Sequence, residues 1–505
     1  MSPSPLADLD LSYLSRAERA ELARLLDGYD GFRLTYYDAP DAFVDDCVDG
    51  VDLYPYQRDI LSSVPVYKRV CVRSLHGIGK TAQVALLVLW FALTRDGLKD
   101  WKIITTASAW RQLQKFLWPE IHKWAGKINW RRVGRQPFTQ RELLDLSIKL
   151  STGEAFAVAS NDVARIEGAH ASALLYIFDE SKAIPAETFD GAEGAFTQDG
   201  VGGKEAFAVA VSTPGEPFGR FYDIQSRKPG YEDWRVRHVS LAEAVAAGQI
   251  APDWADKRRR QWGEKSPIYR NRVLGEFAAD GNDGVIPLSW VEAANERWLE
   301  WMERIAAGEV ELRVAFIGAD IADGGADQST AALRVDAPDL SGISELIRYP
   351  FSQRSLETAG RLRALRRRTG GRVVVDGIGV GSGVVQRLAE MGDEPLSFIA
   401  SAATDVRDST GELGFKNLRS AAWWGFRERL DPDSSGVPIA LPPDDMLTGD
   451  LVAPRWRVLS GGVIAIESKD DIRKRIGRST DSGDAVIQAY GAHLIEDSAI
   501  GWEVF

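Results

Sequence analysis

The sequence has little of what defines several large classes of protein. Its two cysteines, Cys47 and Cys71, are too few for a disulfide framework or a four-cysteine metal site, and its five histidines argue against a zinc site. The longest candidate for a membrane span, Val84–Leu93, is too short to cross a bilayer. No basic or apolar segment of a secretory signal is visible at the start. We therefore expect a protein of a reducing cytosol with no membrane partner.

Positive charge is also in deficit. The formal net charge is −12, which argues against a protein covered by nucleic acid over its whole surface. Local basic clusters nevertheless occur at 257–260, 366–368 and 469–478. Each cluster alone is more often a solvated helix face than a track for phosphates. These clusters are compatible with a local basic channel for nucleic acid but do not establish one.

What the sequence does contain is two stretches of α/β character. Its 505 residues are enough for two or three domains. Short apolar runs alternate with helical patterns first over 51–235 and again over 311–505. We therefore predict a helical segment at 1–50, an α/β core at 51–235, a lid subdomain and linker at 236–310, and a second α/β domain at 311–505.

A glycine-bearing loop, Ser74–Thr81 (SLHGIGKT), lies between the strand-like run Arg69–Arg73 and the helix-like run Ala82–Leu93. This is the position of a phosphate-binding loop. In such a loop, backbone N–H groups around Gly77 and Gly79 and the helix N-terminus surround the phosphates of a nucleotide.

Two side chains of this loop have specific expected roles. Lys80 would reach the β- and γ-phosphates, and the hydroxyl of Thr81 would hold Mg²⁺. Ser74 stands where the common pattern has its first glycine. A tight turn with a surface lysine is the alternative interpretation.

An apolar strand, Leu174–Phe178, ends in two acids, Asp179 and Glu180. A buried strand that ends in this way places a carboxylate at the sheet edge where nucleotides bind. We expect Asp179 to support Mg²⁺ and Glu180 to orient or deprotonate the attacking water. The alternative is a solvated strand end, which the phosphate-binding pattern upstream disfavours.

Weaker elements fit the same site. Gln57 precedes the loop by a short helix and can read the adenine edge, although an ordinary helix start is equally compatible. Ser212 and Thr213 end a neighbouring strand and can sense the γ-phosphate, with a turn or helix cap as the alternative. An arginine over the developing charge also helps phosphoryl transfer. Arg73 and Arg165 are both candidates, within one subunit or toward a neighbouring one, with a surface salt bridge as the alternative.

A second set of acids lies in the C-terminal half. Asp320 and Asp376 each end an apolar strand, and Asp481 and Asp484 open a helix-like run. Three carboxylates at element ends can converge on two divalent ions, which stabilise the attacking and leaving oxygens when a phosphodiester is cut. Oxygen ligands suit Mg²⁺ or Mn²⁺. Each acid alone is more often a turn residue or a helix cap, so the prediction depends on their combination.

The order of these elements resembles the large subunit of tailed-bacteriophage terminase over about residues 50–495. The most telling pieces are Ile166–Ala171 (IEGAHA) and Arg478–Ala485 (RSTDSGDA). The resemblance implies a P-loop ATPase domain of the additional-strand class followed by a ribonuclease-H-like nuclease domain. It also implies ATP as the nucleotide, with Mg²⁺ at both sites or Mn²⁺ at the nuclease site.

The resemblance assigns roles residue by residue. It gives phosphate and metal binding to Lys80 and Thr81, metal support to Asp179 and the hydrolytic base to Glu180. The nuclease ligands that it assigns are Asp320, Asp376 and Asp484. The family often has Pro and Ala where this chain has Thr480 and Gly483, so the choice between Asp481 and Asp484 as the third ligand stays open. Some relatives carry an arginine where His76 stands, which shifts the expected arginine to Arg73 or Arg165.

The implied function is a viral DNA-packaging motor. It would hydrolyse ATP to move double-stranded DNA into a procapsid and cleave concatemeric DNA with a two-metal endonuclease. The implied partners are the portal protein, a small terminase subunit and a homo-oligomeric ring, expected to be pentameric, in the host cytoplasm. A helicase or restriction-type translocase with an attached nuclease is the alternative. A structural subunit with a decayed nucleotide site is a third, which the intact loop and acids disfavour.

Overall fold

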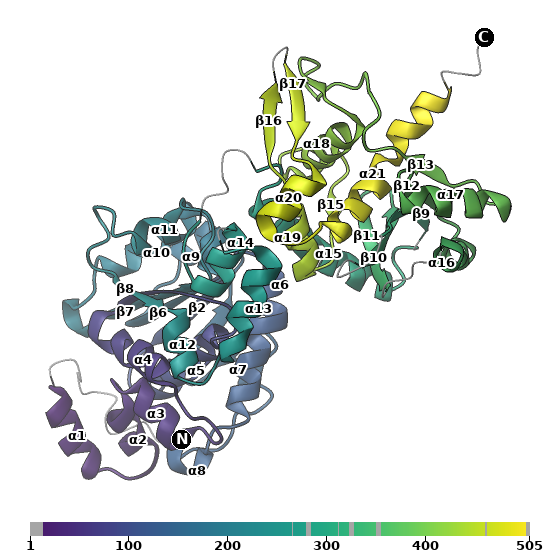
Figure 1. The fold of residues 1–505 in the computed structure, drawn as a ribbon. Coiled ribbons are helices and arrows are strands. Elements are labelled where there is room, and N and C mark those ends of the chain that lie inside the picture. Colours follow the sequence, from purple (N-terminus) through teal and green to yellow (C-terminus); the bar gives the residue numbers. More distant parts are fainter. Residues whose placement is uncertain are drawn as a thin grey trace. The chain divides into compact units, whose positions relative to one another are not determined.

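The computed structural model describes residues 14–264, 266–278, 284–311, 313–322, 328–349, 355–459 and 462–500. The chain forms two compact units, one of Met1–Ala255 and Arg270–Ala279, the other of Asp256–Tyr269 and Asp280–Phe505. Each unit is built around its own sheet (Figure 1). Among the described residues, no helix is both long and apolar enough to cross a membrane. The finer division into four segments stays a prediction.

The first unit contains an eight-stranded sheet. Its strands are β1 (Arg69–Ser74), β2 (Trp101–Ala107), β3 (Leu143–Leu144), β4 (Ser147–Lys149), β5 (Gly153–Ala157), β6 (Ala173–Asp179), β7 (Glu205–Ser212) and β8 (Arg235–Val239). The order is β3-β4-β5-β2-β6-β7-β1-β8, parallel from β5 to β8. Strand β7 therefore lies between the strand that leads into the loop and the strand that ends in two acids. An extra strand at this place characterises the additional-strand class, and the predicted fold of this part is confirmed.

Helices cover both faces of this sheet. They are α1 (Arg16–Arg24), α2 (Gly28–Tyr36), α3 (Pro40–Cys47), α4 (Pro55–Tyr67), α5 (Lys80–Arg95), α6 (Trp110–Gln112), α7 (Trp118–Ala125), α8 (Trp130–Val133), α9 (Val163–Glu167), α10 (Ala186–Phe196), α11 (Arg220–Gln225) and α12 (Leu241–Ala246), with short π or 3₁₀ turns at η2 (Leu113–Leu117), η3 (Ser181–Ala183), η4 (Val201–Gly203) and η5 (Arg270–Leu274). Helix α5 is apolar on every side and is correspondingly buried in the core.

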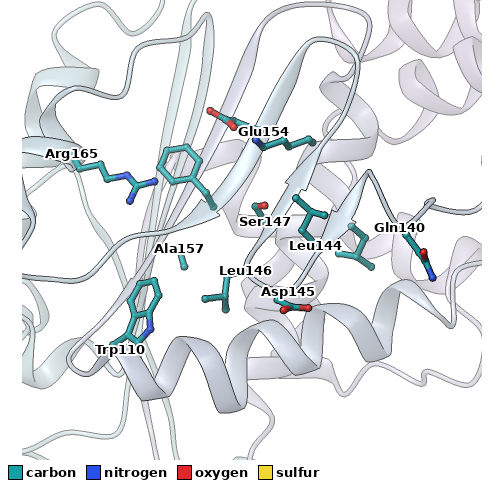
Figure 2. A pocket seen from close by; sticks show the side chains of 12 residues that line it. Trp110, Gln140, Leu144, Asp145, Leu146, Ser147, Glu154, Ala157 and Arg165 are labelled. Carbon is teal, nitrogen blue, oxygen red and sulfur yellow. The ribbon is translucent and has the colours of Figure 1, made fainter.

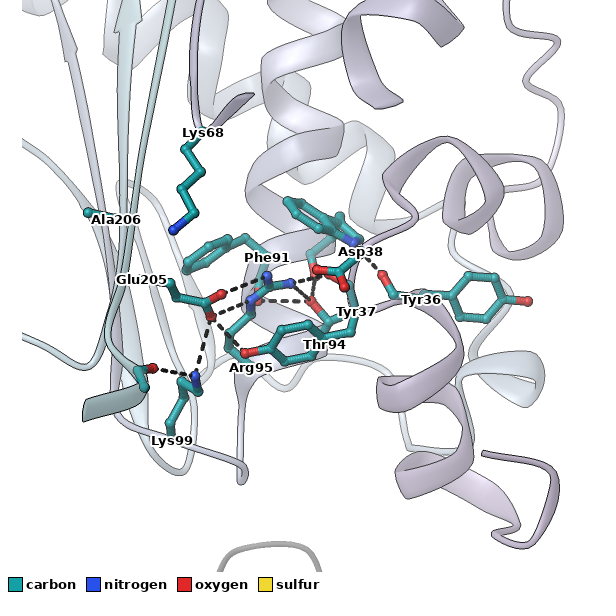
Figure 3. Close-up of polar contacts among 12 residues, drawn as sticks. Tyr36, Tyr37, Asp38, Lys68, Phe91, Thr94, Arg95, Lys99, Glu205 and Ala206 are labelled. Atoms are coloured by element: carbon teal, nitrogen blue, oxygen red, sulfur yellow. Dashed lines mark hydrogen bonds and ion pairs between the residues drawn. The ribbon is translucent and has the colours of Figure 1, made fainter. Parts of the chain in front are cut away.

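A buried ion pair joins the ends of α5 and β7 that lie farthest from the loop. Arg95 is fully buried and places its Nε 3.2 Å from Oε1 of Glu205. Its guanidinium also donates to the Tyr37 carbonyl oxygen at 2.7 Å and lies over the Tyr37 ring (Figure 3). The Tyr37 hydroxyl donates to Glu205 at 2.7 Å. Because Tyr37 follows α2, this network ties the N-terminal helices to the sheet.

The second unit contains a six-stranded sheet. Its strands are β9 (Val314–Asp320), β10 (Ser329–Asp336), β11 (Ser341–Tyr349), β12 (Arg372–Asp376), β13 (Leu396–Phe398) and β15 (Ile439–Ala440), and a small second sheet holds β14 (Gly414–Phe415), β16 (Trp456–Leu459) and β17 (Val463–Ile466). The order is β13-β12-β9-β10-β11-β15, with β9, β10 and β11 antiparallel and β12 parallel to β9. An antiparallel meander extended by parallel strands is the ribonuclease-H-like arrangement, so this fold prediction is also confirmed.

The second unit also contains helices, several of which pack on the faces of its sheet. They are α14 (Pro267–Tyr269), α15 (Leu288–Ala306), α16 (Ser355–Thr369), α17 (Val380–Glu390), α18 (Leu418–Leu430), α19 (Asp445–Val452), α20 (Lys469–Ile476) and α21 (Asp481–Ile500), while α13 (Pro252–Trp262) crosses the boundary between the units in sequence. Helices α16 and α17 pack on one face and α18 and α21 on the other. Helix α21 lies so close to β9 that a Cβ on Gly318 would stand 2.1 Å from the Ala485 carbonyl oxygen.

Candidate active sites

The carboxyl ends of three neighbouring strands bring the predicted nucleotide-site residues together. The register pairs Arg73 on β1 with Ser212 on β7, and Val211 on β7 with Asp179 on β6. The loop after β1 therefore lies at the same edge as the acids of β6. Within it, Gly77 and Gly79 have φ angles of +81° and +80°, a region in which glycine is favoured.

Lys80 lies at the centre of this edge. Its buried ammonium is 3.0 Å from the Thr213 hydroxyl, 3.3 Å from the Ser74 hydroxyl and 3.4 Å from the Leu75 carbonyl oxygen. Burial lowers the pKa of Lys80, and the neighbouring acids oppose this effect. A buried ammonium that only neutral oxygens contact is suited to an anionic ligand such as phosphate.

Ser212 and Thr213 connect the lysine with the second acid. Thr213 accepts a hydrogen bond from Lys80, while the Ser212 hydroxyl donates to Glu180 Oε2 at 3.1 Å. Glu180 has a positive φ of 46°, a strained conformation for a residue with a side chain, and such strain is common at active sites. The two adjacent hydroxyls thus lie between Lys80, the predicted phosphate-binding residue, and the proposed base.

Asp179 is fully buried at the end of β6. One of its oxygens accepts the Glu180 N–H at 3.1 Å, and the other has no hydrogen-bond partner among the described residues. Burial and the nearby Glu180 raise the pKa of Asp179 to about 7. An unsatisfied buried carboxylate oxygen beside a hydroxyl-bearing loop fits a hard cation such as Mg²⁺. Thr81, the other expected ligand, is half-buried at the second position of α5.

Gln57 reaches the loop through its side chain. Its Oε1 accepts the Tyr54 N–H at 3.1 Å, and its Nε2 lies 3.4 Å from the Ile78 carbonyl oxygen. The Tyr56 hydroxyl donates to the same carbonyl at 3.2 Å. The structure therefore places Gln57 against the loop with its amide bonded to backbone, and adenine recognition stays a prediction.

The two candidate arginines lie in different surroundings. Arg73 donates to the Gly275 carbonyl oxygen at 3.2 Å, and its half-buried guanidinium lies 5.6 Å from the centre of the Phe277 ring. Burial lowers the pKa of Arg73. Arg165 instead lines a cavity of about 870 Å³ beside β3, β4 and β5, together with Trp110 (Figure 2). The Arg165 guanidinium lies 5.3 Å from the centre of the Phe156 ring on β5, and β5 is four positions from β1 in the sheet, a strand-to-strand separation of about 19 Å.

The predicted nuclease acids meet at one edge of the second sheet. The parallel register pairs Val375 with Ala319. Asp376 and Asp320, the next and last residues of these two strands, therefore lie side by side. Asp320 is buried, and burial together with Asp484 and Asp481 raises its pKa. Burial also raises the pKa of Asp376, one of whose oxygens accepts the Ile378 N–H at 3.1 Å.

Lys469 at the start of α20 lies among these carboxylates. Its ammonium is 2.7 Å from Asp320 Oδ2, 3.2 Å from Asp481 Oδ1 and 3.6 Å from Asp484 Oδ2. Burial opposes its charge, but the three acids outweigh this effect and raise the pKa of Lys469. From the sequence, Lys469 was identified only as part of a basic cluster. Its contact with Asp320 could not be predicted, because the two residues are far apart in the chain.

Asp484 and Asp481 differ in which strand aspartates they act on electrostatically. It influences the pKa values of both Asp320 and Asp376, whereas Asp481 influences only that of Asp320. Burial favours its neutral form, but Arg419 and Lys469 hold the pKa of Asp484 below its usual value. Asp484 as the third ligand remains a proposal.

The donor set at this edge is chemically suited to Mg²⁺ or Mn²⁺, because all its candidate ligands are carboxylate oxygens. With the side chains as they stand, however, no group of three acidic, histidine or cysteine residues in the described part of the chain is arranged to hold a metal ion. The ammonium of Lys469 contacts the carboxylates of Asp320 and Asp481 at this edge. Metal binding would therefore require Lys469 to move from its contact with Asp320.

Comparison with known proteins finds one sequence relative whose name agrees with the resemblance described above. No protein-family model matches the chain. The probable terminase large subunit of Enterobacteria phage P7 is 26% identical over 238 residues, which are 45% of this chain and 46% of that protein. The chain thus spans about half the length of the curated relative it matches.

Two phage proteins are among the solved structures to which the chain shows some similarity. The large terminase of a thermophilic bacteriophage, in complex with ADP, is 12% identical, with 88% of this chain and 98% of that chain covered and a TM-score of 0.39. The nuclease domain of the large terminase subunit gp2 of bacterial virus Sf6 is 19% identical, with 41% and 97% covered and a TM-score of 0.34. The sequence match to the phage P7 protein confirms the resemblance of this chain to the large subunit of phage terminase.

Proposed function

We propose that this chain is a viral DNA-packaging motor that hydrolyses ATP and also cuts DNA. The observation that carries the proposal is the pairing of two phosphate-handling sites in separate units of one chain. One site joins Lys80 through Thr213 and Ser212 to Glu180. The other gathers Asp320, Asp376 and Asp484 at a sheet edge.

In the ATPase site, each residue has a role that follows from its contacts. Lys80 and the loop N–H groups bind the β- and γ-phosphates. Glu180 orients the attacking water and accepts its proton. Ser212, whose hydroxyl contacts Glu180, is placed to sense the γ-phosphate. Asp179 and Thr81 would hold Mg²⁺, which neutralises charge on the phosphate oxygens.

In the nuclease site, the carboxylates of the two strand ends and of α21 would hold the ions that bind the scissile phosphate. Asp320, Asp376 and Asp484 would hold two Mg²⁺ or Mn²⁺ ions, with Asp481 beside them, and these ions stabilise the attacking and leaving oxygens. Lys469 keeps the acids together until metal enters. Arg419, which contacts Asp484 at 3.5 Å, limits the direction in which that carboxylate can turn.

The proposed partners follow from this activity. They are double-stranded DNA, the portal protein of a procapsid, a small terminase subunit and further copies of this chain in a ring, within the host cytoplasm. The proposed functional division is an ATPase core at 51–235 with a lid at 236–310 and a nuclease domain at 311–505. A helicase or restriction-type translocase is disfavoured, because the second sheet is not a second ATPase-like lobe.

The decisive experiment combines two assays on the full chain. Supercoiled plasmid is incubated with Mn²⁺, Mg²⁺ or EDTA, and ATP hydrolysis is measured with and without procapsids. We expect cutting only with metal, and hydrolysis that procapsids stimulate. A chain that cuts without hydrolysing ATP would be a nuclease only, and unwinding of a duplex without procapsids would favour the helicase alternative.

A further inference from the structure

Helix α21 carries two acids of the proposed nuclease site, and its first turn is held from outside the helix. Asp450 on α19 is 1% exposed and accepts hydrogen bonds from the backbone N–H groups of Ser482 at 2.9 Å and Gly483 at 3.1 Å. A helix cannot satisfy these N–H groups internally, and its dipole favours a carboxylate at this end. Asp450 therefore caps a helix to which it does not belong.

The residue that would ordinarily cap α21 has another partner. Thr480 directly precedes the helix, where a threonine hydroxyl commonly accepts a hydrogen bond from a free N–H group. Here the hydroxyl instead donates to Asp484 Oδ2 at 2.9 Å. The N–H groups of Ser482 and Gly483 bond to Asp450 rather than to the Thr480 hydroxyl, so the first turn depends on Asp450 for its cap.

Two arginines contact the residues at which α19 and the first turn of α21 meet. Arg478 donates to Asp450, and Arg348 on β11 places its Nε 3.1 Å from the Ser482 hydroxyl. Arg348 also forms two hydrogen bonds with Asp444, at 2.9 and 2.7 Å, and Asp444 caps α19 itself. The starts of α19 and α21 are thus joined by one continuous network, and Figure 1 shows both helices beside α20.

Gly483 permits this close approach. A Cβ at this position would stand 2.9 Å from the Cβ of Asp450 and 3.4 Å from its carbonyl carbon. The first distance is shorter than real Cβ contacts, so an alanine would push the two helices apart. This contact explains why the chain has glycine where the related motif often has alanine.

We propose that Asp450 is a positioning residue of the nuclease site, which acts through the first turn of α21 to keep Asp481 and Asp484 directed toward Asp320, and that Gly483 is the glycine this contact requires. The inference rests on the proposed nuclease function. Without Asp450, the two N–H groups lose their acceptor and the Arg478 guanidinium loses one of its acceptors. Loss of a group that orients metal ligands costs about 10- to 100-fold in metal affinity or activity.

The test uses the full chain and three variants, Asp450→Ala, Asp450→Asn and Gly483→Ala. The exposed Asp433→Ala in the same unit is the matched control. Mn²⁺ affinity is measured by titration calorimetry, thermal unfolding is followed in EDTA, and amide hydrogen exchange is followed over 480–486. Plasmid cutting is resolved into kcat and KM.

We expect Asp450→Ala to weaken Mn²⁺ binding roughly tenfold, to speed exchange over 480–486, and to lower kcat with KM for DNA unchanged. Asp450→Asn keeps one acceptor oxygen and should fall between Asp450→Ala and wild type; it also serves if the alanine variant does not fold. Gly483→Ala should follow Asp450→Ala. Lower thermal stability with wild-type Mn²⁺ affinity would overturn the positioning role and leave the nuclease proposal standing. Failure of the wild-type chain to bind Mn²⁺ would overturn both.

Discussion

The Lys469 ammonium lies 2.7 Å from Asp320 Oδ2, so a cation of the chain itself contacts the most buried acid of the proposed nuclease site. The same ammonium contacts Asp481 and Asp484. An ammonium and a divalent ion require the same carboxylate oxygens, and only one of them can be closest to Asp320 at a time. Lys469 therefore stabilises the cluster and competes with the metal that the cluster would bind.

Replacing Lys469 by alanine should destabilise the chain in EDTA and increase its stabilisation by Mn²⁺. Breaking a fully buried ion pair costs about 3–5 kcal/mol. Since the Lys469 side chain is 39% exposed, we expect roughly 1–2 kcal/mol after screening by water. Denaturant unfolding with EDTA or Mn²⁺ measures both effects. Lys474→Ala, on the same helix with a side chain 79% exposed, is the control. Equal stabilisation of wild type and Lys469→Ala by Mn²⁺ would contradict the competition.

Lys80→Ala should abolish ATP turnover and leave metal-dependent cutting of plasmid largely intact. The variant removes the buried ammonium between Thr213 and Ser74, and loss of one such electrostatic contact costs on the order of 100-fold or more in kcat. Lys123→Ala, on the exposed side of α7, is the control. ATP hydrolysis that survives Lys80→Ala would show that the nucleotide binds elsewhere.

Glu180→Gln should retain ATP binding and lose hydrolysis, because its partner Ser212 can still donate to the amide oxygen.

Asp320→Ala should have the reverse effect, with plasmid cutting lost and ATP turnover retained. The variant removes a carboxylate from the edge formed by β9 and β12, which lies in a different unit from Lys80. Asp470→Ala, an exposed position next to Lys469, controls for loss of charge near the site. Cutting that persists in Asp320→Ala would show that the assignment of the nuclease site is wrong.

The effects of replacing Arg73 and Arg165 on ATP hydrolysis should depend differently on assembly with procapsids. Arg73 lies next to the loop of its own chain, so Arg73→Ala should slow hydrolysis by the isolated chain as well as by the assembly. Arg165 faces a cavity beside β5, a strand about 19 Å from β1 across the sheet, so Arg165→Ala should slow only hydrolysis that procapsids stimulate. ATPase assays with and without procapsids measure the difference. A loss of basal hydrolysis in Arg165→Ala would remove it as an arginine that acts on a neighbouring subunit.

The part of the sites that the sequence predicts is the part set by local patterns. The loop at Ser74–Thr81 and the acids after β6 are contiguous motifs, and parallel strands bring their carboxyl ends to one edge. The same reasoning places Asp320 beside Asp376. These predictions needed no knowledge of side-chain packing.

What the sequence did not predict depends on contacts between distant segments. Lys469 is 149 residues from Asp320 and lies in a charge cluster that is typical of a solvated helix. Asp450 is buried on a short helix and is recognisable only from its hydrogen bonds to Ser482 and Gly483. Their roles arise from tertiary packing, which no periodicity in a single sequence encodes.

The buried pair Arg95–Glu205 should make the first unit sensitive to acid. Burial opposes ionisation of Glu205, but Arg95 and Lys99 outweigh it and lower the pKa of Glu205 below its ordinary 4.5. Since that pKa is lower in the folded than in the unfolded chain, the contribution is present above about pH 4.5 and is lost as the pH falls through the folded value.

Glu205→Gln should therefore lower the free energy of unfolding at neutral pH and weaken its pH dependence below about pH 4.5. Because Arg95 is fully buried, leaving it without a carboxylate should cost roughly 3–5 kcal/mol. The control is Glu193→Gln, which disrupts the more exposed pair with Arg69 and should cost about 1 kcal/mol or less. Urea unfolding, followed by tryptophan fluorescence between neutral pH and about pH 4, measures both variants. If the two losses were equal at neutral pH, the pair would not be what fixes Tyr37 and the N-terminal helices to the end of β7, and docking of those helices would rest on their other contacts, which include the hydrogen bonds that link Tyr29 to Leu93 and Tyr36 to Trp90 on α5.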